Sequence, residues 1–315
     1  MHKVSVWLLI SGLAAFPADL RLGLIGADTS HTVAFTNLLN NPSAEGHVPG
    51  ARVVAAYKGE SRIPAAPANP HRADRFAAEL ESKFGIEIVP DIATLCKKVD
   101  AVLLESNDGR LHLKQAKEVI AARKPMFIDK PLAATLEDAR EIARLAAEAG
   151  VPWFSSSGHR FSAMSRSMKF ADATSVVVWG ASPLEPLFPL DLAWYGIHSI
   201  EGLYTLMGPG CEEVTRVVGR DSDVITGRWK DGRTGVFHAM RTGGGSGAVV
   251  FRPKAVVQSD PKPAGGGYEP LVREIVKFFQ TRTPPVPAAE TLEIVAFMDA
   301  AQRSKAAGGQ PMRLR

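Results

Sequence analysis

The sequence contains few cysteines, no cluster of like charges and no apolar run long enough to cross a membrane. Its two cysteines, Cys96 and Cys211, are far apart and give neither a disulfide framework nor the spacing of a zinc site. The 37 basic residues are scattered, with no run longer than a pair such as Lys97-Lys98. Because nucleic-acid-binding proteins need a basic stripe with aromatic residues beside it, we expect no nucleic-acid partner.

The bulk composition is that of a globular protein with room for a large core. The chain has 315 residues, of which 45% are hydrophobic and 22% charged, and its formal net charge is +4. This length suits two domains of ordinary size.

The first residues have the pattern of a signal peptide. Met1-His-Lys3 gives a short positive start, residues 4–16 are apolar and uncharged, and Ala18 is a suitable cleavage point. The stretch is too short for a membrane-spanning helix. We therefore expect a signal peptide at residues 1–18 and a periplasmic or secreted protein with no membrane part after cleavage. The alternative is an apolar extension packed on the sheet of a cytoplasmic protein.

The first half of the remaining chain alternates strands with helices, which predicts a parallel sheet covered on both faces. This is an α/β Rossmann domain, expected at residues 19–154. Its strands are expected at residues 20–25, 51–57, 85–89, 100–105, 125–129 and 151–154, with helices between them.

From residue 155 onward, short β runs linked by Gly-rich turns predict an open antiparallel sheet. Two helices, at residues 271–281 and 288–307, follow these runs. The second domain, residues 155–315, is thus expected to be α+β, and its last helix can pack back onto the first domain.

The turn after the first strand has a damaged nucleotide-binding pattern. The segment Leu22-Gly-Leu-Ile-Gly26 is the end of a strand and the start of a tight turn, and a helix is expected after it. This order is typical of the start of a dinucleotide-binding unit. Counting Gly-x-Gly-x-x-Gly from Gly26, however, Asp28 stands at the second glycine position and His31 at the third. A carboxylate at the second position would repel a pyrophosphate.

The end of the second strand lacks the acidic residue that would bind the ribose of NAD. The strand ends Tyr57-Lys58-Gly59, and Glu60 comes too late. Lys58 either faces the 2′-phosphate of NADP or faces water. The sequence leaves the choice between NAD, NADP and no cofactor open.

Four motifs occur in order along the chain, and together they resemble the Gfo/Idh/MocA family of glucose–fructose oxidoreductase and inositol dehydrogenase relatives. The resemblance implies a Rossmann domain with an open-faced sheet domain, NAD(P) as cofactor, and sugars, polyols or related small molecules as substrates. Some secreted relatives with tightly held NAD are glycosidases instead. The motifs are Gly23-Leu-Ile-Gly26, Ile128-Asp-Lys-Pro-Leu132, Gly158-His-Arg-Phe161 and Tyr195-Gly-Ile-His198.

The resemblance implies that Lys130 and His198 are the catalytic residues. Lys130, in Asp-Lys-Pro where the family has Glu-Lys-Pro, can hydrogen-bond a substrate hydroxyl and stabilise its alkoxide. His198 matches the general base, a role that suits imidazole because its pKa lies near neutral. The family's Asp four residues earlier is replaced by Trp194, whose ring can stack on a sugar.

The other expected site residues are grouped by the ligand that they would contact. Arg160 contacts substrate or bridges the domains, and Glu105 is either an acid near the reaction centre or a buried charge paired with Lys130. No ligand spacing supports a metal. At the nucleotide we expect Gly26, Ala27, Asp28, Ser30, His31, Lys58, Ser106, Asn107 and Asp129, and at the substrate Arg160, Trp194, Tyr195 and His112.

Three functions stay open. The first is an NAD(P)-dependent oxidoreductase of a small carbohydrate, the second a nonredox or NAD-recycling glycosidase or lyase, and the third a sugar-binding protein without cofactor. The broken glycine pattern favours the last two, whereas Lys130 and His198 favour the first two. By analogy with the family, the exposed face of the second sheet is a candidate surface for homo-oligomer formation.

Overall fold

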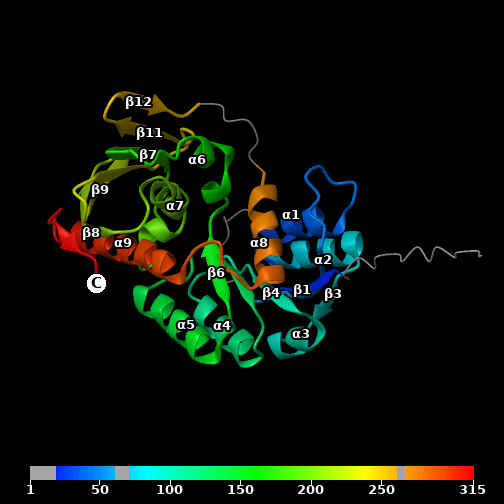
Figure 1. Ribbon diagram of the computed structural model, residues 1–315. Helices are drawn as coiled ribbons and strands as arrows, with labels where there is room; N and C mark the ends of the chain where they lie inside the picture. Colours follow the sequence, from blue (N-terminus) through cyan, green and yellow to red (C-terminus); the bar gives the residue numbers. More distant parts are fainter. Residues whose placement is uncertain (1–18, 61–70, 261–266) are drawn as a thin grey trace, which may run out of the picture.

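The computed structural model describes residues 19–60, 71–260 and 267–315, and the expected signal peptide at residues 1–18 lies outside these ranges. The described chain forms two β-sheets, each with helices packed against it (Figure 1). Within these ranges, none of the helices is both long enough and apolar enough to cross a membrane.

The first sheet has six parallel strands in the order β3-β2-β1-β4-β5-β6. This is the order of a doubly wound dinucleotide-binding domain, and its crevice opens at the carboxyl ends of the strands, beside the reversal between β1 and β4. The predicted Rossmann domain is confirmed. Its strands are β1 (Leu20–Ile25), β2 (Ala51–Tyr57), β3 (Glu87–Val89), β4 (Ala101–Leu104), β5 (Met126–Asp129) and β6 (Trp153–Ser156).

Helices cover both faces of this sheet because successive strand residues point to opposite sides. Leu22 and Leu24 pack in one core with α1 (Ser30–Asn40), α2 (Arg72–Phe84) and α8 (Glu269–Thr281). Ile25 packs in the other core. On that side the first sheet is covered by α3 (Ile92–Lys98), α4 (His112–Ala121) and α5 (Leu136–Ala149), which Figure 1 shows together below the sheet.

The second sheet has seven strands in the order β12-β11-β7-β10-β9-β8-β13. It is mixed rather than wholly antiparallel, because β7 and β10 pair in parallel. The connection that leaves β7 contains α7 (Gly196–Met207), so the chain returns by a crossover and not by a hairpin. The strands are β7 (Ser175–Ala181), β8 (Cys211–Val218), β9 (Ser222–Trp229), β10 (Thr234–Met240), β11 (Gly247–Arg252), β12 (Ala255–Gln258) and β13 (Met312–Arg313).

Two C-terminal helices join the domains. The segment α8 belongs to the second half of the chain, yet it covers the first sheet beside α1. The last helix, α9 (Ala288–Ala306), lies against β8 of the second sheet and also contacts α5 of the first domain (Figure 1). The two domains therefore share a buried boundary, and the carboxyl edge of the first sheet faces the second domain there.

Candidate active site

A cavity of about 550 Å³ lies between the two domains. The amino end of α1, the loops after β4 and β5, the end of β7 and the start of α7 contribute to its walls. Of the residues expected from the sequence, it is lined by Ser30, His31, Asn107, Lys130, Trp194, Tyr195 and His198.

The turn after β1 is built around Gly26. Its φ of +92° favours glycine, and an added Cβ would lie 2.5 Å from the backbone of Ser106. The neighbouring carboxylate of Asp28 is 2% exposed and accepts a hydrogen bond from the backbone N–H of Asn107 at 2.9 Å. Ala27 is fully buried beside it. The carboxylate at the second glycine position therefore ties two turns together and does not line the cavity.

His31 and Asp129 form a buried pair at the third glycine position. His31 Nδ1 lies 2.7 Å from Asp129 Oδ2, and the imidazole stacks on Phe35 and meets Tyr268 edge-on. Burial would raise the pKa of Asp129, but its interaction with His31, together with the charge and backbone of Lys130, lowers this pKa to about 2. The carboxylate of Asp129 therefore stays ionised beneath the cavity floor.

Lys130 follows β5 directly, at the carboxyl edge where crevices of parallel sheets open. Its side chain lines the cavity and forms no ion pair with any residue in the described part of the chain. The ammonium is thus available to a ligand.

His198 lies in the first turn of α7, where Ser157 and His159 approach it. Ser157 Oγ is 2.6 Å from His198 Nδ1, and the two imidazole rings have their centroids 5.1 Å apart. Burial lowers the pKa of His198 well below its ordinary value, and the charge of Lys130 adds to the effect. The same two causes lower the pKa of His159. Both imidazoles are therefore neutral at neutral pH, and His198 can accept a proton.

The loop that carries Trp194 and Tyr195 is held by a buried ion-pair network. Arg216 on β8 is fully buried and bonds both Asp191, in the short helical turn Asp191–Ala193, and Asp223 on β9. Because a buried guanidinium needs good partners on all sides, this network fixes the start of the loop. Trp194 and Tyr195 line the cavity from there.

Eight of the predicted site residues lie outside the cavity lining, and three of these are held by partners elsewhere in the described chain. His112 is fully buried, and its two ring nitrogens face the backbone carbonyls of Ser106 at 2.7 Å and Leu132 at 3.2 Å. Lys58 forms an exposed ion pair with Asp74 at 2.6 Å. Neither side chain lines the cavity in this structure, and ligand contact by His112 or Lys58 stays a prediction.

Arg160 is the third of these residues. Its guanidinium pairs with Glu201 on α7 and Glu290 on α9, each at 2.6 Å, and it does not line the cavity. These ion pairs join the segment after β6 to α7 and α9. Substrate contact by Arg160 would require breaking both ion pairs.

Glu105, just after β4, is fully buried, and no hydrogen-bond partner is found for either carboxylate oxygen within the described residues. Burial raises its pKa well above the ordinary value, and the negative charge of Asp129 adds to this shift. No ion pair joins it to Lys130 in the described chain, so the expectation of a Glu105–Lys130 pair is corrected. A neutral acid is cheaper to bury than an unpaired charge.

Sequence reasoning missed Ser157, His159, Ser199 and Tyr268, which also line the cavity. Ser157 and His159 follow β6, so their place at the carboxyl edge of the sheet was a usable signal. Tyr268 is different, because it precedes α8 and reaches the site only through the return of that helix to the first domain.

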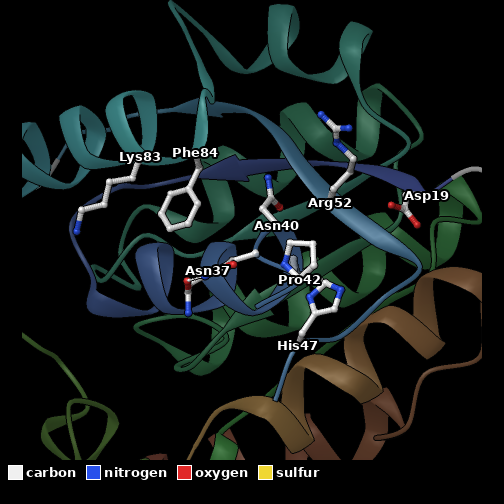
Figure 2. Close-up of a pocket in the computed structure, with 10 residues that line it drawn as sticks. Asp19, Asn37, Asn40, Pro42, His47, Arg52, Lys83 and Phe84 are labelled. Atoms are coloured by element: carbon white, nitrogen blue, oxygen red, sulfur yellow. Dashed lines mark hydrogen bonds between the residues drawn. The ribbon is translucent and has the colours of Figure 1, made fainter. Parts of the chain in front are cut away.

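A second hollow, of about 720 Å³, lies at the opposite edge of the first sheet. It is formed by Asp19 and Arg52 near the amino ends of β1 and β2, together with Asn37, Asn40, His47 and Lys83 (Figure 2). The catalytic candidates Lys130 and His198 are not among its residues. It is therefore separate from the candidate active site.

Comparisons with known proteins agree with this architecture. Residues 20–157 match the Gfo/Idh/MocA family, described as an oxidoreductase family with an NAD-binding Rossmann fold. The resemblance expected from the four motifs is thereby confirmed. No match was found among the curated proteins.

Solved structures extend the likeness to both domains. Myo-inositol dehydrogenase from Lactobacillus casei, in complex with NAD(H) and myo-inositol, superposes with a TM-score of 0.77 at 18% identity, over 95% of this chain and 97% of that one. Myo-inositol 2-dehydrogenase from Lactobacillus plantarum gives 0.76 at 14% identity, over 95% and 100%. A probable dehydrogenase from Thermotoga maritima gives 0.73 at 20% identity, over 94% and 99%. At these identities the likeness shows the fold.

Proposed function

We propose that this protein, whose residues 20–157 match the Gfo/Idh/MocA oxidoreductase family, is an NAD-dependent dehydrogenase acting on a hydroxyl of a sugar, a polyol or a related small carbohydrate. The observation that carries the proposal is one shared cavity. The amino end of α1, the ammonium of Lys130 and the neutral imidazole of His198 all line it.

The residues at the α1 end fit a dinucleotide despite the missing glycines. Thr29 caps the helix, and Ser30, His31 and Arg72 line the cavity beside it, so hydroxyl, N–H and guanidinium donors face a pyrophosphate position. The repulsion expected from Asp28 is avoided because its carboxylate is buried against Asn107. Bound NAD would supply the hydride acceptor.

The protein's own residues would manage the proton. Lys130 would hydrogen-bond the reacting hydroxyl and stabilise the negative charge that develops on its oxygen. His198 would take the proton, since burial and the nearby ammonium keep it neutral. Ser157 would hold the ring through Nδ1 and leave Nε2 for the substrate. Trp194 and Tyr195 provide aromatic surface for the carbohydrate.

The experiment that tests the proposal combines cofactor release with turnover. The purified protein is denatured and assayed for released nucleotide by mass spectrometry, and NAD and NADP are titrated into the native protein. A carbohydrate panel is then followed by NADH absorbance and product analysis. NAD binding with NADH formation supports a dehydrogenase. A hydrolysed or eliminated product without net NADH would indicate the NAD-recycling glycosidase or lyase, and no nucleotide binding would indicate a binding protein.

Lys130→Ala is the matched variant for this assay. It should abolish turnover and leave the fold intact, whereas Lys254→Ala, an exposed lysine in the turn between β11 and β12, should leave turnover unchanged. Full activity of Lys130→Ala would remove this lysine from the mechanism.

We also propose that residues 1–18 direct export and are then removed. The first strand begins at Leu20, so cleavage after Ala18 would leave the Rossmann sheet whole. The mature protein isolated from its host should begin at Asp19 and be found outside the cytoplasm. A retained Met1 would support the cytoplasmic alternative.

Self-association is proposed through the face of the second sheet that α7 and α9 leave uncovered. Val217, Val224 and Val256 are exposed on strands of this sheet, at 61%, 36% and 65%. Light scattering should show a homo-oligomer that Val256→Lys weakens. A monomeric protein at high concentration would contradict this arrangement.

A further inference from the structure

The charges that line the substrate side of the cavity are unbalanced. The lining contains the cation Lys130 and the imidazoles of His159 and His198, but neither an aspartate nor a glutamate of the described chain. A second cation, Arg72, belongs to α2, which packs on α1, and we assign it to the nucleotide end. From this geometry we propose that the substrate carries a carboxylate, so that the site takes a sugar acid in preference to a neutral sugar or polyol. This inference rests on the proposed dehydrogenase function.

Lys130 forms no ion pair with any residue of the described chain, and the nearest carboxylate identified beside it is that of Asp129. The acidic group next to it in the chain, Asp129, is 3% exposed and is held by His31 at 2.7 Å beneath the cavity floor. Trp194, four residues before His198, lines the same cavity with an aromatic ring and adds no negative charge to it. An ammonium that faces a cavity without an ion-pair partner favours an anionic ligand.

The other polar groups of this region are suited to a carboxylate. Ser157 and Ser199 line the cavity and can donate hydroxyl hydrogen bonds to carboxylate oxygens. Aromatic rings of Trp194 and Tyr195 remain for the apolar face of the sugar. The site therefore offers one cation and several neutral donors.

This donor set favours a singly charged group over a phosphate. On the substrate side Lys130 is the one residue in the described lining with a permanent positive charge. His159 and His198 are neutral because burial and Lys130 lower the pKa of each. A phosphate dianion is usually matched by more than one cation, with an arginine favoured for its bidentate geometry.

The test is a binding comparison that does not depend on turnover. Glucose, galactose and mannose are titrated calorimetrically into the purified protein beside the corresponding uronates, aldonates and 6-phosphates, with and without NAD. We expect the dissociation constant of at least one carboxylate to be about tenfold or more below that of its neutral parent. This preference should shrink as salt is added, because exposed and half-buried charges are screened.

Two variants assign the effect to named residues. Lys130→Met should abolish the preference for carboxylates, and Trp194→Asp, which adds a carboxylate to the lining, should reverse it. Lys254→Met removes an exposed charge far from the cavity and should change nothing. Circular dichroism and the melting temperature establish that each variant is folded.

The outcomes separate this inference from the proposed function. NADH formation from neutral sugars, with no tighter binding of any carboxylate, would overturn the inference and keep the dehydrogenase. Tight carboxylate binding without NADH formation would keep the inference and overturn the dehydrogenase. Tighter binding of the 6-phosphates than of the carboxylates, or no binding of any carboxylate, would overturn the inference.

Discussion

Ser157 Oγ and His198 Nδ1 lie 2.6 Å apart, and this contact joins the end of the first sheet to the first turn of α7 in the second domain. The hydroxyl also accepts a hydrogen bond from the backbone N–H of His159 at 3.2 Å. Its position is thus fixed by the backbone, and through it the orientation of the His198 ring is fixed. The geometry of the proposed catalytic site therefore depends on how closely the two domains are held together.

Ser157→Ala should lower kcat while KM stays close to that of the wild type. The variant removes the contact that orients the imidazole but leaves the cavity wall in place, so we expect a loss of about tenfold to a hundredfold. Steady-state kinetics measures it. Ser82→Ala, on the exposed surface of α2, is the matched control and should be silent. An unchanged kcat for Ser157→Ala would show that the contact does not position the base.

The pH profile should reveal the influence of Lys130 on His198. Burial and the ammonium lower the pKa of His198, so the acid limb of kcat/KM should lie below pH ~6.5, the ordinary histidine value. Lys130→Met removes the nearby positive charge, and the pKa of His198 should rise. The ring resonances followed by NMR report this shift even when turnover is lost, with His198→Gln as the assignment control. A pKa that stays or falls in Lys130→Met would contradict the arrangement.

Much of the fold was predictable because it depends on local patterns. Alternating strands and helices predicted the first sheet, and the bounds of β1 and β2 agree with the expected ranges. The parallel pairing of β7 with β10 was not predictable, because it is set by a crossover through α7 rather than by residues at the strand ends. Nor does any local signal show that α8 returns to the first sheet.

The candidate site was predictable in part for the same reason. Lys130 and His198 could be placed because each belongs to a motif at a strand end or helix start. The contact between His31 and Asp129 could not be predicted, because the two residues are 98 positions apart in the sequence. They meet only when the sheet brings the segments after β1 and β5 to the same carboxyl edge. The burial of Asp28 was hidden likewise, because a sequence shows a carboxylate but not the direction of its side chain.

Glu105→Gln should stabilise the protein above pH ~5 and leave its stability unchanged near pH 4. The pKa of buried Glu105 is raised well above the ordinary 4.5, so the unfolded chain releases this proton at a lower pH than the folded protein does. The free energy of unfolding of the wild type therefore falls as the pH rises above 4.5, by up to about 1.4 kcal/mol per pH unit for one proton. Glutamine is neutral at every pH and removes this loss.

Urea unfolding of both proteins between pH 4 and pH 8 checks this prediction. Glu118→Gln, on the exposed side of α4, serves as control and should follow the wild type. A Glu105→Gln variant that is less stable at pH 8 than the wild type would mean that the carboxylate is ionised and bound in the folded protein.

Gly26→Ala should cost more stability than Gly85→Ala and should also abolish NAD binding. Both glycines have positive φ, +92° and +64°, so an alanine is strained at each position by about 1 kcal/mol. At Gly85 an added Cβ meets nothing within 4 Å, whereas at Gly26 it lies 2.5 Å from the backbone of Ser106. Urea unfolding and calorimetric titration of NAD measure the two effects. Equal costs would show that the turn after β1 can open.

The pair of His31 and Asp129 should behave as one unit in a double-variant cycle. Both side chains are nearly buried, at 10% and 4% exposed, so Asp129→Asn or His31→Gln alone leaves a buried polar partner without its contact and should cost about 1–3 kcal/mol. The double variant should cost much less than the sum. Because the pKa of Asp129 is lowered to about 2 from 3.8, its contribution is complete above pH 3.8 and is lost as the pH falls toward 2.

Nucleotide binding by the same variants decides what the pair is for. If His31 only stands where the motif has its third glycine and does not contact the nucleotide, the double variant should bind NAD as the wild type does. If His31 supplies positive charge to the pyrophosphate, His31→Gln and the double variant should both bind NAD more weakly, by about tenfold. Asp129→Asn, which keeps the imidazole, should then bind NAD more tightly than His31→Gln. The reverse order would show that the carboxylate, and not the imidazole, shapes the nucleotide end of the cavity.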